Sequence, residues 1–93
     1  MKIKARIAVV VDSQPVVSEG EVDLRSGATV KKFMKKADKA MGFKKPKPFR
    51  GSLKQGRPPT ILLNGDRLDL PEGWKHRLTE GDEVTVLTPM MGG

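Results

Sequence analysis

The sequence predicts an α+β domain in which one main helix packs on one face of a mixed sheet of about five strands. Two observations lead to this class. Apolar and polar residues alternate near both ends of the chain, and one stretch between them has helical spacing. A chain of 93 residues is expected to form a single domain with a modest core. We assign residues 1–88 to this domain and residues 89–93 to a flexible tail.

The first 24 residues predict a β-hairpin. Residues 2–11 and 16–24 both alternate with a period of two, and the sequence DSQP between them is typical of a turn. A turn centred on residues 13 and 14 would place opposite charges across the two strands on the solvent face. The opposed pairs would be Lys4 with Asp23 and Arg6 with Glu21.

A helix is predicted after the hairpin. Thr29 is a suitable N-cap because its hydroxyl can accept a free backbone N–H of the first turn, and Gly42 is a suitable C-terminal stop. The apolar stripe of this helix is Val30, Phe33, Met34, Ala37 and Met41. The sheet residues expected to meet it in the core are Ile3, Ile7, Val9, Val22, Leu24, Leu63, Val84 and Val86.

The second half of the chain predicts a loop and three further strands. Residues 43–59 are rich in proline, glycine and basic residues, and we expect a long loop without regular structure. A strand and a short strand follow, joined at Asn64-Gly65, the preferred two-residue hairpin turn. GDEVTVLT forms the last strand. This order of elements is typical of ubiquitin-like β-grasp domains.

The end of the chain carries the most informative motif. LTEGDEVTVLTPMMGG combines a Gly-Asp-Glu turn at residues 81–83, an apolar strand, Pro89 and the diglycine Gly92-Gly93. In this motif, and in the preceding hairpin ILLNGDRLDL, the chain resembles the small sulfur carrier proteins of the MoaD and ThiS family. Met91 beside the diglycine departs from the usual tail. The pathway therefore stays open among molybdopterin synthesis, thiamin synthesis, tRNA thiolation, and the synthesis of cysteine or another sulfur-containing product.

The resemblance implies a protein co-substrate that is not itself an enzyme. In the family, a ubiquitin-activating-type adenylyltransferase uses ATP to adenylate the C-terminal carboxylate, and sulfur from a persulfide donor then replaces AMP. The resulting thiocarboxylate, here expected on Gly93, gives its sulfur to a sulfur-accepting synthase. The resemblance also implies that Leu87 contacts the partner enzyme. We expect no bound cofactor, because the chain has no glycine loop that could cradle phosphate.

The tail residues suit entry into the active site of another protein. Gly92 and Gly93 have no Cβ and can thread a narrow channel. Pro89 has a fixed φ and should stiffen the point where the tail leaves the sheet. Met90 and Met91 are flexible apolar side chains that could line such a channel.

Two other functions stay open at this point. The same terminus could form an amide with a target lysine, as a ubiquitin-like modifier does. A nucleic-acid-binding β-grasp module similar to TGS domains would explain the basic residues, although it would not explain the diglycine.

The positive charge is concentrated in one stretch. The chain has a net charge of +7, but residues 31–57 hold eleven basic residues and one acid. Like charges four residues apart on the predicted helix cost about 0.2–0.5 kcal/mol per pair, so they do not stabilise it. We consider tRNA or another nucleic acid, an acidic protein partner, or a merely solvated face, with Phe43 and Phe49 available for base stacking. The candidate contacts are Lys31, Lys32, Lys35, Lys36, Lys39, Lys44, Lys45, Lys47 and Arg50.

Composition excludes several other classes. Cysteine is absent, which excludes disulfides and cysteine zinc sites, and the lone His76 has no partners for a metal site. No apolar run is long enough to span a bilayer, and the first residues lack a signal-peptide cleavage site. We therefore expect no metal, no membrane association and a cytoplasmic location.

Overall fold

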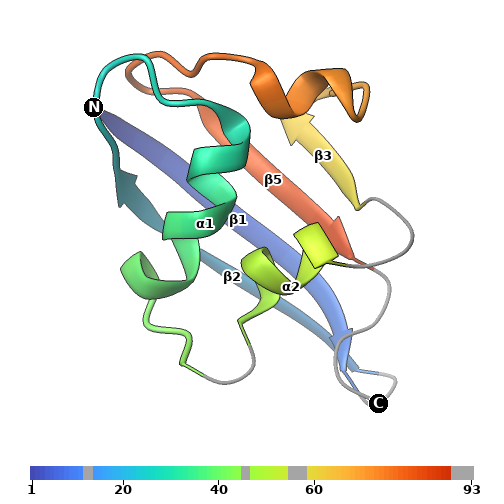
Figure 1. The fold of residues 1–93 in the computed structure, drawn as a ribbon. Helices are drawn as coiled ribbons and strands as arrows, with labels where there is room; N and C mark the ends of the chain where they lie inside the picture. Colours follow the sequence, from blue (N-terminus) through green and yellow to red (C-terminus); the bar gives the residue numbers. More distant parts are fainter. Residues whose placement is uncertain (12–13, 45–46, 55–58, 89–93) are drawn as a thin grey trace.

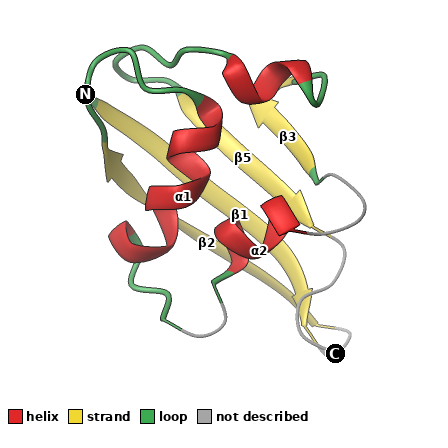
Figure 2. Cartoon of the chain, viewed as in Figure 1, coloured by secondary structure: helices red, strands yellow, loops and turns green. Residues whose placement is uncertain are grey.

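The computed structural model describes residues 1–11, 14–44, 47–54 and 59–88. Its elements are β1 (Lys2–Val11), β2 (Gln14–Asp23), α1 (Val30–Ala40), α2 (Pro48–Lys54), β3 (Thr60–Leu63), β4 (Asp66–Arg67), the 3-10 helix η1 (Glu72–Lys75) and β5 (Glu83–Thr88). The five strands form one mixed sheet in the order β2-β1-β5-β3-β4, and α1 and α2 lie on the same face of it (Figures 1 and 2). The predicted β-grasp class is therefore confirmed.

The hairpin of β1 and β2 forms, but in a different register from the predicted one. Lys4 lies opposite Glu21 and Arg6 lies opposite Glu19, which is two residues away from the expected pairing. Arg6 Nε lies 3.3 Å from Glu19 Oε1. Because strand side chains alternate with a period of two, a shift of two residues keeps each one on its predicted face. The shift only exchanges one acidic partner for another.

The strand that precedes the tail lies in the middle of the sheet. β5 pairs in parallel with β1 and antiparallel with β3, so it is hydrogen-bonded on both sides. A parallel pair needs a long crossover connection, and the segment that contains α1 and α2 provides it. Val84 and Val86 of β5 are fully buried beneath the helices.

Helix α1 agrees with the sequence prediction. The Lys32 backbone N–H donates to Thr29 Oγ1 at 3.3 Å, as expected for an N-cap threonine. Gly42 follows the helix with a φ of +81°. The buried apolar core contains Ile3, Ala5, Ile7, Val22, Leu24, Val30, Phe33, Met34, Ala37, Phe49, Ile61, Leu78, Val84 and Val86. Met41 and Leu63 pack at its edge, and the side chain of Val9 lies outside those that the structure describes.

Helix α2 lies inside the stretch for which the sequence predicted no regular structure. Pro48 occupies its first position, where the fixed φ of proline suits a helix. The Phe49 ring is fully buried and packs edge-on against Phe33, with ring centroids 5.7 Å apart. The prediction that Phe49 stacks on bases is therefore wrong. The ring is a core residue that fastens α2 to the rest of the domain.

The second hairpin has the predicted turn. Asn64 and Gly65 have φ angles of +53° and +87°, as the tight turn between β3 and β4 requires. The turn places Asn64 beside the start of β5, where its side chain has a further role described below.

Candidate functional site

The predicted reactive tail starts directly after β5. Thr88, the last residue of the strand, pairs with Val9 of β1, and the preceding Leu87 pairs with both Ala8 of β1 and Thr60 of β3. The tail therefore leaves from the middle of a hydrogen-bonded sheet. Residues 89–93 lie outside the described residues, so the roles expected for Pro89, Met90, Met91, Gly92 and Gly93 stay predictions.

Leu87 lies on the open face of the sheet, away from the helices. Its side chain is 37% exposed, and its neighbour Ala8 lies opposite Val17 of β2, which is 52% exposed. Val17, Ala8 and Leu87 thus form an apolar row across three strands, here called the Leu87 row. It lies one residue before the end of β5. The row is small, and Leu87 and Val17 are its exposed members.

Sequence reasoning found Leu87 but missed its two neighbours in the row. A signal was present, because the alternation in residues 2–11 places Ala8 on the same face as Lys4 and Arg6. An apolar residue at the end of a charged face indicates a local change of environment. Which residue of β2 lies beside Ala8 depends on the register of the hairpin, and the predicted register was two residues away.

The turn before β5 is held by one aspartate. Asn64 Nδ2 donates to Asp82 Oδ1 at 3.0 Å, and the Thr79 backbone N–H donates to Asp82 Oδ2 at 2.8 Å. Asn64 Oδ1 in turn accepts the Glu83 backbone N–H at 2.9 Å. The hydrogen bond from Asn64, followed by that from Thr79, lowers the pKa of Asp82 below its ordinary value of 3.8. Gly81 has a φ of +84°, so a residue with a side chain would be strained there.

These contacts explain the Gly-Asp-Glu part of the sequence motif. They join the turn between β3 and β4 to the start of β5, while the Lys4 N–H donates to the Asp82 carbonyl at 2.9 Å. The Lys2 N–H also donates to Glu80 Oε2 at 2.8 Å. The motif therefore anchors the first residues of β5 on two sides. A strand that is anchored at its start gives the tail at its other end a fixed point of origin.

The predicted basic contacts lie on the helical side of the molecule. Lys31, Lys32, Lys35, Lys36 and Lys39 are all exposed on α1, and Lys44, Lys47 and Arg50 are exposed in and before α2. Lys45 lies outside the described residues. The structure thus separates the two predicted sites. The Leu87 row belongs to the open face of the sheet, and the basic residues belong to the helical layer. Figure 1 shows that α1 and α2 cover the face opposite the open one.

Two features are absent from residues 1–11, 14–44, 47–54 and 59–88. None of their helices has the length and apolar composition needed to cross a membrane. Within the same ranges, no three side chains of the histidine, cysteine, aspartate and glutamate types gather closely enough to hold a metal ion.

Comparisons with known proteins agree with this geometry. The model of the ThiS family matches residues 7–93, which includes β5, the tail and the diglycine. The crystal structure of SAMP1 from Haloferax volcanii is similar, with a TM-score of 0.60 and 20% identity over 100% of both chains. The solution structure of the Haloferax volcanii HVO 2177 protein has a TM-score of 0.54 and 20% identity, over 99% of this chain and 88% of that one.

The curated protein sequences contained no match to the chain. At 20% identity, the two structural similarities concern the fold alone, and both describe the same arrangement of sheet and helix. The family match rests on the sequence itself and extends over nearly the whole chain. The chain therefore belongs to the ThiS family and has the ubiquitin-like β-grasp fold.

Proposed function

We propose that this protein is a sulfur carrier whose C-terminal carboxylate, on Gly93, is converted to a thiocarboxylate. Family membership supports the broader class of ubiquitin-like sulfur carriers and modifiers, and one observation favours a reactive terminus within it. The match to the family runs through Gly92 and Gly93, beyond the end of the folded sheet. A diglycine contributes nothing to a core, so a pattern that includes it points to a chemical role for the terminus.

The proposed chemistry needs an activating enzyme because a carboxylate is a poor electrophile. Attack of the carboxylate on the ATP α-phosphate forms an acyl-adenylate and releases pyrophosphate. In the acyl-adenylate, AMP replaces oxide as the leaving group on the acyl carbon. A persulfide from a donor then attacks the acyl carbon, and AMP departs. Cleavage of the resulting acyl disulfide by a second thiol leaves the thiocarboxylate. All of these thiols belong to partners, since the chain has no cysteine.

The protein's own contribution is to present the terminus. β5 is held on both sides in the sheet, and its start is anchored through Asp82, so only the residues beyond Thr88 need to enter the partner's active site. We propose that the Leu87 row is the surface on which the activating enzyme docks. It is apolar, it is exposed, and it lies directly before the tail. Docking there would bring the tail to the enzyme at high local concentration.

The test is the intact mass of the protein isolated from its own organism. A thiocarboxylate replaces one oxygen by sulfur, and fragmentation should place the change in the C-terminal peptide. The matched control is a chain with one alanine appended after Gly93, in which the folded domain is unchanged and the diglycine is no longer terminal. Absence of the sulfur form in the parent protein, or its presence in the extended chain, would contradict the proposal.

A ubiquitin-like modifier is the second candidate, because it would use the same acyl-adenylate. A lysine amine of a target protein would attack in place of the persulfide, and an amide would form. The same cells distinguish the two functions. Conjugates of higher mass that carry a Gly-Gly remnant on lysine indicate modification, whereas a free chain with terminal sulfur indicates the carrier.

A further inference from the structure

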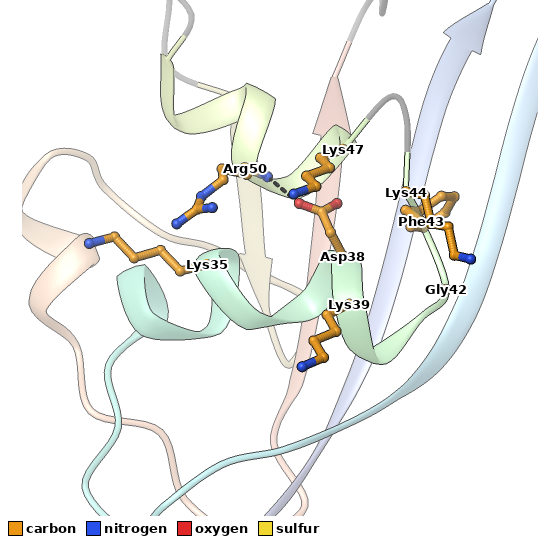
Figure 3. A pocket seen from close by; sticks show the side chains of 8 residues that line it. All are labelled: Lys35, Asp38, Lys39, Gly42, Phe43, Lys44, Lys47 and Arg50. Atoms are coloured by element: carbon orange, nitrogen blue, oxygen red, sulfur yellow. Dashed lines mark hydrogen bonds between the residues drawn. The ribbon is translucent and has the colours of Figure 1, made fainter.

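The helical layer holds a recess that the proposed sulfur chemistry does not use. It lies between the end of α1 and the start of α2 and has a volume of about 440 Å³. Figure 3 shows that Lys35 and Arg50 lie to one side of the Asp38 carboxylate and Lys44 to the other. We call this the cationic recess, and its basic residues are Lys35, Lys39, Lys44, Lys47 and Arg50.

The one acid of this stretch does not neutralise the recess at the surface. Asp38 is 3% exposed, and its two carboxylate oxygens accept the backbone N–H groups of Phe49 and Arg50, each at 2.9 Å. Its role is to hold the first turn of α2 against α1. The same contact places Lys47 and Arg50 opposite the lysines of α1. Asp38 therefore positions the cations of the recess, while its own carboxylate stays buried and the rim stays positive.

Apart from Lys39, which complements the helix dipole in the last turn of α1, these cations give the fold no evident benefit. Within the described residues, the salt bridges join the Met1 amino group to Asp23 and Arg6 to Glu19, and neither lies on the helical layer. The lysines of α1 repeat at a spacing of four, which places like charges side by side. A surface that is costly to the fold and carries one sign of charge is suited to an external anion.

The surroundings of the recess favour a nucleic acid over an acidic protein. Protein interfaces have apolar or aromatic residues at their centre and are poor in lysine. Among the described residues, the large exposed apolar side chains are Val16, Val17 and Leu87, which all belong to the sheet. Interfaces with nucleic acids are polar, strongly positive and rich in lysine and arginine contacts to phosphate. The helical layer has the second composition.

The contacts should be to phosphate and not to bases. Phe49 is fully buried, and Phe43 is half-buried with its ring 6.4 Å from that of Phe49. Neither ring stands free on the surface as a stacking platform. Affinity should therefore depend strongly on salt and weakly on base sequence.

We propose that the cationic recess and the adjoining lysines of α1 bind the phosphate backbone of a nucleic acid. The interaction leaves the open face of the sheet free, because the helices cover the opposite face (Figure 1). A nucleic acid and a protein partner on the Leu87 row could thus be bound at once. This inference stands apart from the sulfur carrier function, since it depends on no property of the tail.

The experiment measures fluorescence anisotropy of a labelled RNA duplex of about 20 base pairs over a series of salt concentrations. A DNA duplex of the same sequence and poly-L-glutamate are the other two probes. Lys35→Gln/Lys39→Gln/Arg50→Gln removes three of the five positive charges of the recess. Lys2→Gln/Lys4→Gln/Arg67→Gln is the matched control, because it removes the same charge from exposed positions on the sheet.

We expect the parent protein to bind RNA with a log–log salt slope of about −4 to −7, because the recess and the adjoining lysines of α1 offer about five to eight phosphate contacts. The recess variant should lose about tenfold or more in affinity at about 0.1 M salt. Its salt slope should become shallower by about 3, because three phosphate contacts are lost. Its melting temperature should stay equal or rise, because like-charge neighbours are removed, and the control variant should bind nearly as well as the parent. Equal binding of RNA and DNA would support backbone recognition, and a preference for RNA would assign contacts to the 2′-hydroxyl as well.

Three results would overturn the proposal. The first is no saturable binding of either duplex at about 50 mM salt. The second is an equal loss in the two triple variants, because net charge alone would then explain the affinity. The third is tighter binding of poly-L-glutamate than of either duplex, which would assign the surface to an acidic protein.

Discussion

The two sides of this molecule carry their charges in different ways. On the open face of the sheet, Lys4 lies opposite Glu21 and Arg6 opposite Glu19, so the cations of β1 meet the acids of β2. On the helical layer, the lysines of α1 have one another as neighbours, and the one acid, Asp38, is buried beneath them. Basic side chains are thus paired with acidic side chains of the fold on the sheet, whereas on the helical layer they are available to a partner.

The two sides also differ in apolar exposure. The open face carries the Leu87 row, which is small, apolar and directly before the tail. The helical layer carries a charged recess and shows no large exposed apolar side chain among the described residues. We propose two kinds of partner for this small domain, a protein on the sheet and a nucleic-acid phosphate backbone on the helices. Variants that damage one side alone can separate them.

The largest effect is expected from Phe49→Ala, which removes the buried side chain that joins α2 to the core. Removal of a fully buried ring that packs against Phe33 should lower the free energy of unfolding by about 3–5 kcal/mol. Urea denaturation followed by circular dichroism measures the change. Phe49→Leu is the matched control and should cost less than about 1.5 kcal/mol, because it keeps most of the apolar volume. Similar stability of the two variants would show that the ring does not fasten α2.

Leu87→Asp should damage the open face alone. A charge in the Leu87 row should lower kcat/KM for carrier-dependent pyrophosphate exchange by the activating enzyme by about 30-fold, which corresponds to about 2 kcal/mol. Thr85→Asp places the same charge on the same strand face beside Arg6 and should have a smaller effect. The salt slope of RNA binding should stay that of the parent protein in both variants. Equal activity of the two variants would show that the Leu87 row is not part of the docking surface.

Asp38→Asn distinguishes geometry from net charge on the helical layer. The amide can accept one of the two N–H groups of α2, so one buried donor is left without its acceptor at a cost of about 1–2 kcal/mol. The variant is also more positive than the parent. If net charge governs RNA affinity, binding should strengthen, but we expect it to weaken by a few-fold because α2 no longer holds Lys47 and Arg50 in place. Anisotropy at one salt concentration decides between the two outcomes.

The smallest effect concerns pH and the anchor of β5. The hydrogen bonds from Asn64 and Thr79 lower the pKa of Asp82 below 3.8, so they favour its charged form in the folded protein. The stabilisation is therefore fully present above pH 3.8 and is lost as the pH falls through the lower folded-state pKa. The side chain is partly exposed, so solvent keeps this contribution small.

Unfolding of the parent protein and of Asp82→Asn between about pH 6 and about pH 2.5 tests this prediction. The difference in unfolding free energy should be constant at the upper end and should shrink at the lower end. A difference that is unchanged across the whole range would show that the Asp82 charge does not contribute to the anchor.

Several parts of the site were visible before the structure, for reasons that are local. The strand alternation indicated which side chains of β1 and β2 face outwards, and it survived a register error of two residues because the period is also two. Leu87 and the tail residues followed from a terminal motif that is continuous in the sequence. By contrast, α2 was missed because its first turn is held by Asp38, which lies ten residues before Pro48.

By itself, the sequence determined the class of the fold, the start of α1 at Thr29, the turn at Asn64-Gly65 and the concentration of cations in one stretch. Each depends on residues within a few positions of one another, or on composition. Only the tertiary structure decided the hairpin register, the burial of Phe49, the recess between α1 and α2, and the meeting of Val17, Ala8 and Leu87. These depend on contacts between segments that are distant in the sequence, and such contacts form only when the whole core packs.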